Sequence, residues 1–86
     1  MRLCGRNHLE ELKQTNPSST VWVNAWLAEL DVAVWKSGQD AMKQFPRASC
    51  VDGQSFIFKV DGSNVVIETI IDFKLLLVLI TSIKVM

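Results

Sequence analysis

The chain has no net charge and little histidine or cysteine, and each shortage excludes a class of function. Nine basic residues balance nine acidic ones over 86 residues. Because affinity for phosphates rises with the number of basic contacts, this balance argues against strong autonomous binding of nucleic acid. Cys4, Cys50 and His8 are too few and too scattered to supply the four ligands of a structural zinc site, so we expect no metal and no other cofactor.

The sequence also lacks a secretory segment and a long apolar run. Its first residues, "MRLCGRNHLEELK", contain no apolar core of a signal peptide, which predicts a cytoplasmic protein with reduced thiols. The longest apolar run, at 75–80, has six residues, whereas a membrane-spanning helix needs about 20. We therefore expect no membrane segment.

Helical periodicity is present in the first half of the chain. Leu9 and Leu12 lie three residues apart and predict a helix over about 7–15, with Asn7 as its cap. A second helix is predicted over 19–36. Its cap is Ser18 or Ser19 and its stop is Gly38.

An apolar stripe on the second helix predicts the helical side of the core. It consists of Trp22, Trp26, Leu30 and Ala33, widened by Val23, Leu27 and Val34. Two tryptophans at this spacing can also form a base-stacking surface for nucleic acid, but the surrounding aliphatic residues favour the core. "DAMKQF" predicts one further helical turn, which Pro46 ends.

After residue 50 the apolar period changes to that of a strand. In "SFIFKV" the alternation puts Phe56 and Phe58 on a buried face and Lys59 on the opposite one. "DGSN" at 61–64 predicts a hairpin, and 65–73 and 75–86 predict two more strands. Helices followed by an antiparallel meander predict one α+β domain over 1–86, with the helices packed on a sheet of three or more strands. A short strand at "MRLC" would add an edge.

Three stretches carry a resemblance to a known family: "MRL" at the start, "AVWKSGQDAMKQFPRAS" at 33–49 and "VDGQSFIFKVDG" at 51–62. They resemble the HigB family of bacterial toxins, which belongs to the RelE/ParE-like superfamily of type II toxin–antitoxin systems. The resemblance covers about residues 1–62. It implies a RelE/ParE-like fold, ribosome-dependent cleavage of messenger RNA, and a HigA-type antitoxin as the partner.

The resemblance also implies that cations projecting from the sheet would act on RNA. Lys59, within the resembling stretch, and Lys84, as a replacement for a missing family arginine, are the candidate catalytic cations, which would stabilise charge on the phosphate under attack. Lys43, Arg47 and Lys74 are the candidate RNA-binding residues. Without the resemblance, strand alternation makes Lys59 an ordinary solvent-facing lysine.

The last third of the chain departs from the family pattern, so the C-terminal part of the domain is expected to be diverged or truncated. Val66 stands near the position of a family arginine, and the Thr-His-x-Glu-Tyr-Asp ending of the family is absent. Three interpretations therefore remain open: an active messenger-RNA interferase, a weakened or non-catalytic homologue that still binds an antitoxin, and a small protein-interaction domain. The apolar final strand, if it lies at a sheet edge, also predicts self-association.

Overall fold

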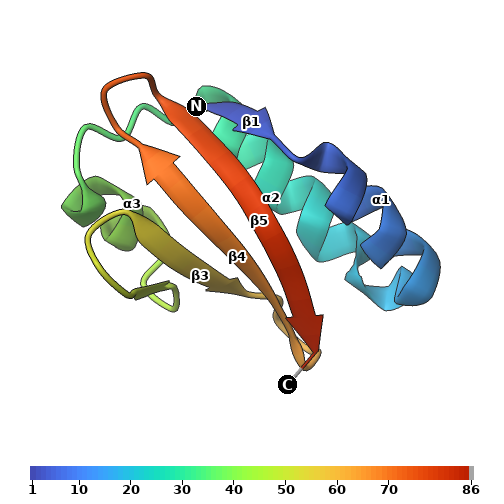
Figure 1. The fold of residues 1–86 in the computed structure, drawn as a ribbon. Helices are drawn as coiled ribbons and strands as arrows, with labels where there is room; N and C mark the ends of the chain where they lie inside the picture. The colour runs from blue at the N-terminus through green and yellow to red at the C-terminus, as the bar shows by residue number, and fades with distance from the viewer. Residues whose placement is uncertain (86) are drawn as a thin grey trace.

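The computed structural model describes residues 1–85 as three α-helices and a five-stranded sheet (Figure 1). Along the chain these are β1 (Arg2–Cys4), α1 (Arg6–Thr15), the 3-10 turn η1 (Pro17–Ser19), α2 (Thr20–Val32), α3 (Gly38–Gln44), β2 (Ser49–Cys50), β3 (Ser55–Lys59), β4 (Val65–Asp72) and β5 (Leu77–Val85). The predicted α+β class and the order of helices before strands are confirmed.

The sheet has the order β1-β5-β4-β3-β2 and is mixed rather than purely antiparallel. β2 to β5 pair antiparallel, as the meander predicts, whereas β1 pairs parallel to β5 from Arg2↔Leu77 to Cys4↔Leu79. The expected edge at "MRLC" is confirmed, and β2 is an additional short strand. The final strand is therefore not the outer edge along Leu77–Leu79, because β1 covers it there.

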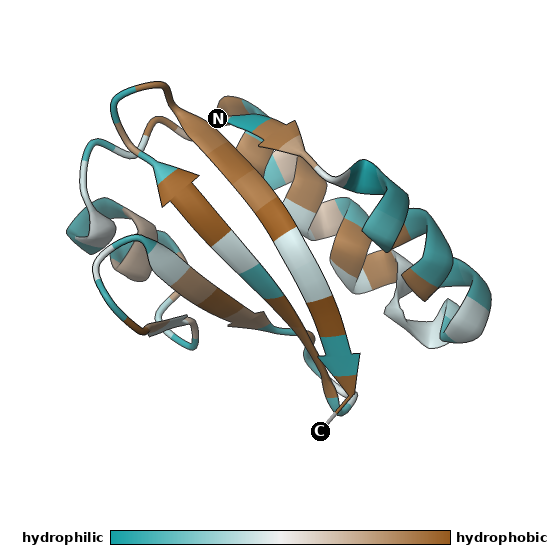
Figure 2. Cartoon of the chain, in the orientation of Figure 1, coloured by the Kyte–Doolittle hydropathy of each residue, from teal (hydrophilic) through white to brown (hydrophobic). Residues whose placement is uncertain are grey.

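All three helices contribute to one core on one face of the sheet. Its fully buried side chains include Leu9 from α1, Trp26 from α2, Ala41 from α3, and Phe56 and Phe58 from β3. Trp26 contacts Phe58 at a ring distance of 5.3 Å, so the predicted packing on the phenylalanine face is confirmed for Trp26. Trp22, from the same predicted stripe, is only partly buried. In Figure 2, α1 is largely hydrophilic on its visible side, as expected of a helix with one buried stripe.

The predicted limits of the helices need correction. α2 ends at Val32 instead of Lys36, because the following segment is extended and buries Ala33 and Trp35 while Val34 stays 60% exposed. Gly38 begins α3 instead of stopping α2. Asn7 does not cap α1: the residue before the helix is Gly5, with a φ of 90°, which glycine adopts without a steric penalty.

The other face of the sheet, which we call the outer face, carries the alternate residues of the strands. Ile70 and Leu79 on this face are 43% and 41% exposed. Within residues 1–85 none of the helices has the length and hydrophobicity that a bilayer-spanning segment requires.

Candidate functional site

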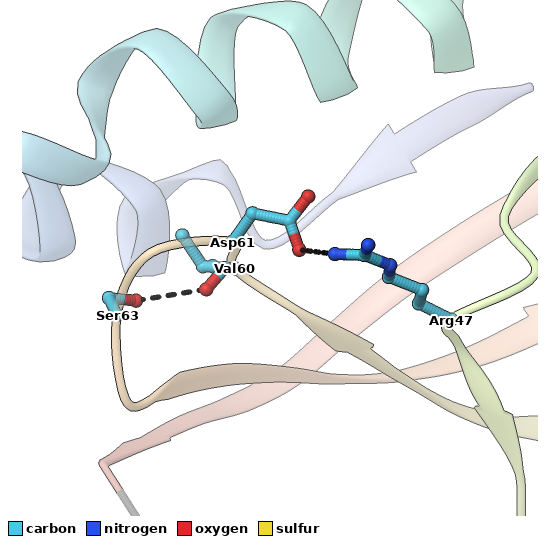
Figure 3. Close-up of polar contacts among 4 residues, drawn as sticks. All are labelled: Arg47, Val60, Asp61 and Ser63. Carbon is cyan, nitrogen blue, oxygen red and sulfur yellow. Dashed lines mark hydrogen bonds and ion pairs between the residues drawn. The ribbon is translucent and has the colours of Figure 1, made fainter.

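The hairpin between β3 and β4 fixes one end of the outer face. Gly62 has a φ of 80°, which a tight turn requires here. The Ser63 hydroxyl donates to the Val60 carbonyl at 3.1 Å and accepts from the Val65 amide at 3.2 Å (Figure 3). Because the Val60 amide also donates to the Val65 carbonyl at 3.0 Å, the turn is held from both sides. This local network sets the positions of Lys59 and Asp61 on either side of Val60.

Strand register brings the two candidate catalytic lysines into one row. Lys59 pairs with Val66 on β4, and Val66 pairs with Lys84 on β5. Directly opposed residues share a face, so both lysines lie on the outer face, about 10 Å apart at two strand spacings. Val66 is only 7% exposed between them, which fits lysine stems packed over a valine.

Arg47 extends this row on the other side of Lys59. It lies in the turn at 46–47, which the Ala48 amide closes by donating to the Phe45 carbonyl at 3.0 Å, just before β2. This turn places Arg47 beside Lys59, and both side chains line the same surface hollow. The residues Arg47, Lys59 and Lys84, drawn from three separate segments, are called the basic row below.

The three cations of the basic row differ in their charge partners. Arg47 donates from Nη1 to Oδ1 of Asp61 at 3.1 Å (Figure 3), and Lys84 Nζ lies 3.4 Å from Glu68 Oε1. Within residues 1–85 no carboxylate lies within ion-pair distance of Lys59. Lys59 is therefore the member of the row whose charge is most available to an anion.

Glu68 is held in its charged form by its neighbours. A hydrogen bond donated by the Ser82 hydroxyl, assisted by Lys84, lowers the pKa of Glu68 below its ordinary value despite some desolvation. The resulting carboxylate neutralises part of the charge of Lys84. This arrangement makes Lys84 a weaker candidate for phosphate contact than Lys59.

A pocket of about 280 Å³ adjoins the row at Arg47 and Lys59. Trp22 and Phe45 supply aromatic walls, and Asp61 is the only carboxylate among the lining residues. Such a pocket offers stacking surface, two cations and one proton acceptor within a small space. These are groups that a nucleotide can use: a flat base, a phosphate and a hydroxyl proton.

Two of the sequence-predicted RNA contacts lie apart from the Arg47–Lys59 pocket. Lys74 follows β4, while Lys59 pairs with Val66 at the start of that strand. The six residue steps from Val66 to Asp72 therefore place the two lysines about 20 Å apart. Lys43 is exposed in the last turn of α3 and lines neither hollow at Arg47.

Sequence reasoning did not identify Asp61 as a site residue, because "DGSN" marks it only as a turn residue. The helical stripe allows a base-stacking role for Trp22 but favours a place in the core. In the structure Trp26 is fully buried, but Trp22 remains partly exposed at the pocket. His8, the single histidine, lines a different hollow with Ile83 and Val85.

No protein-family model matches the chain, and no curated protein is significantly similar to it. The functional argument therefore depends on the geometry of the basic row and its pocket.

Proposed function

We propose that this chain is a HigB-like toxin of a type II toxin–antitoxin system that cleaves messenger RNA on the ribosome, and that the basic row is its RNA-binding surface. The observation that carries the proposal is that Lys59 and Lys84 share one end of the outer face, and that Arg47 lines the same hollow as Lys59. A row of cations across a sheet suits the phosphates of a single strand.

The reaction is attack of a ribose 2′-oxygen on the adjacent phosphorus. The new O2′–P bond forms, the P–O5′ bond breaks, and negative charge builds on the phosphoryl oxygens in between. The leaving 5′-oxygen takes a proton from solvent water, which gives a 2′,3′-cyclic phosphate and a free 5′-hydroxyl. Lys59 is the cation suited to stabilise that charge. Asp61 is the pocket residue able to accept the 2′-hydroxyl proton, and its carboxylate contacts Arg47 at 3.1 Å.

The second candidate is a weakened or non-catalytic homologue that retains antitoxin binding. Two observations favour it: His8 lies outside the pocket, and Asp61 is paired with Arg47. For a HigA-type antitoxin or a second copy, the available apolar surface is the outer face around Val51, Ile70 and Leu79. The same surface supports the third interpretation, a small protein-interaction domain.

Cleavage of messenger RNA on translating ribosomes tests the proposal. Lys59→Ala should slow cleavage about 100-fold, the scale of one lost electrostatic donor. Lys59→Arg should retain part of the rate, because the charge is kept while its geometry changes. Lys13→Ala on α1 is the matched control and should cleave at the wild-type rate. Because Lys59 is exposed, melting temperatures should barely differ among the variants.

The outcomes separate the candidates. Equal cleavage by wild type and Lys59→Ala would leave Lys59 as a solubility residue and end its catalytic assignment. A wild-type chain that does not cleave, yet is kept in solution by a co-expressed helix-turn-helix antitoxin, would favour the non-catalytic homologue. A chain with neither property would favour the interaction domain.

A further inference from the structure

The aromatic walls of the Arg47–Lys59 pocket are held rigidly by the core. The ring of Trp22 stacks on buried Trp26 with centroids 5.9 Å apart and planes 18° apart. Phe45 makes edge contacts with Trp35 at 5.9 Å and with Phe58 at 5.5 Å. Trp22 and Phe45 are themselves only partly buried, so they present aromatic surface to the pocket without a side-chain rearrangement.

The size and polar groups of the pocket limit what it can hold. Its volume of about 280 Å³ lies just below the roughly 300 Å³ at which pockets for drug-sized ligands begin, so one small flat group fits it better than a larger ligand. Gln44 also lines it. The Gln44 side-chain oxygen accepts the Trp35 indole N–H at 2.9 Å, which leaves the amide N–H donors for the edge of a ligand.

We infer that this pocket binds one unpaired base of a single-stranded RNA, stacked on Trp22 and Phe45, with a phosphate of the same nucleotide on Arg47 and Lys59. The inference rests on the proposed function for the identity of the strand as RNA. Arg47 can take part without leaving Asp61, since that carboxylate uses one of five guanidinium N–H groups. Base stacking is tolerant of sequence, so the pocket positions the strand without selecting a codon.

The test titrates the full chain at low salt with a short oligoadenylate and with the same oligonucleotide carrying abasic ribose phosphates. Tryptophan fluorescence and the anisotropy of a labelled strand are both measured. Trp26 and Trp35 are only 1% and 2% exposed, so quenching on binding reports Trp22. Oligoadenylate should quench, whereas the abasic strand and inorganic phosphate should not.

Variants then separate the base pocket from the phosphate contacts. Trp22→Leu should weaken oligoadenylate binding about tenfold and leave the affinity for the abasic strand unchanged. Trp22→Phe, the conservative variant, should keep most of the affinity. If Trp22→Leu does not fold, quenching of the wild-type chain still decides the question.

One outcome would overturn the base pocket alone. In it, Arg47→Ala and Lys59→Ala weaken binding, but binding causes no quenching and has the same affinity for abasic and complete strands. No binding of any strand at low salt would overturn both the pocket and the RNA surface proposed for the row.

Discussion

At the scale of single residues, the contact between Arg47 and Asp61 affects the affinity with which the proposed RNA-binding row would bind a phosphate. The two side chains are 81% and 54% exposed, so the ion pair adds little to stability. The carboxylate of Asp61 nevertheless lies 3.1 Å from Arg47, and its charge would repel a phosphate that binds Arg47 from another side. Asp61 therefore both orients the guanidinium and competes with the ligand.

Because the carboxylate and a phosphate carry the same sign of charge, Asp61→Asn should strengthen RNA binding about threefold, the scale of one exposed ion pair. Asp31→Asn, an exposed change on α2, is the control and should have no effect. Anisotropy of a labelled strand at low salt measures both. If Asp61→Asn binds RNA more weakly, then Asp61 contributes more by orienting Arg47 than it costs by repelling the phosphate.

Trp26 is a large, fully buried residue of the core, and the stability of the fold should depend strongly on it. It is 1% exposed, and its indole N–H has no hydrogen-bond partner among residues 1–85. Trp26→Ala should cost about 3–5 kcal/mol, a large share of the stability of a small domain. Trp26→Phe loses no hydrogen bond and fills most of the volume, so it should cost only ~1–2 kcal/mol. Urea unfolding measures both, and a loss below about 1 kcal/mol for Trp26→Ala would remove Trp26 from the core.

At the scale of elements, the strands were more predictable than the ends of the helices. Period-two alternation follows from backbone geometry alone. The sequence therefore predicts that Phe56 and Phe58 lie on one face of the sheet and Lys59 on the other. The end of α2 depends on distant residues instead: the Met1 nitrogen donates to the Leu30 carbonyl at 2.9 Å and to the Ala33 carbonyl at 2.6 Å. Such long-range contacts leave no local pattern.

The site shows the same division between local and long-range information. Lys59 was accessible to sequence reasoning as a residue of a family-like stretch, and Lys84 as a replacement for a missing family arginine. That the two lie in one row, however, depends on strand register. A bulge at Glu68/Thr69 shifts the pairing of β4 with β5, so Ser82 and Lys84 share the outer face although Ile80, two residues before Ser82, faces the core. The Arg47–Asp61 contact joins residues 14 apart through a turn and cannot be deduced from either segment.

The contact of Glu68 on β4 with Ser82 and Lys84 on β5 also makes the stability of the fold depend on pH. The Ser82 hydrogen bond and Lys84 lower the pKa of Glu68 below its ordinary 4.5. A carboxylate with a lowered folded-state pKa stabilises the fold above 4.5, and this contribution is lost as pH falls through the folded-state pKa. The melting temperature should therefore fall in acid, and Glu68→Gln should make that fall shallower.

Melting curves from neutral to acid pH measure this effect, with Glu29→Gln on α2 as the matched control. The fall should not vanish in Glu68→Gln, because amide hydrogen bonds from Ser55 and Gln54 also lower the pKa of Asp52. The same acid dependence in wild type and Glu68→Gln would contradict the cross-strand origin of the effect.

At the scale of the whole molecule, the proposed function requires a chain of zero net charge to bind a polyanion with few cations. The formal charge is zero, and two members of the basic row already have carboxylate partners. Affinity for free RNA is set by the number of phosphates neutralised, so it should be low at physiological salt. Under the proposed function, the ribosome then has to hold the message while the row acts on one phosphate.

The salt dependence of RNA binding tests whether the basic row contacts only a few phosphates and the ribosome is needed to hold the message. Each phosphate neutralised on a single strand contributes about −0.7 to the slope of log affinity against log salt, so a row of Arg47, Lys59 and Lys84 should give a slope of about −2. Lys59→Ala should reduce the slope by about 0.7, whereas Lys13→Ala should leave it unchanged. Anisotropy of a labelled single strand over a range of salt concentrations provides the slopes. A wild-type slope more than twice as steep would require a larger basic surface than the row supplies, and the chain would then not need the ribosome to hold its substrate.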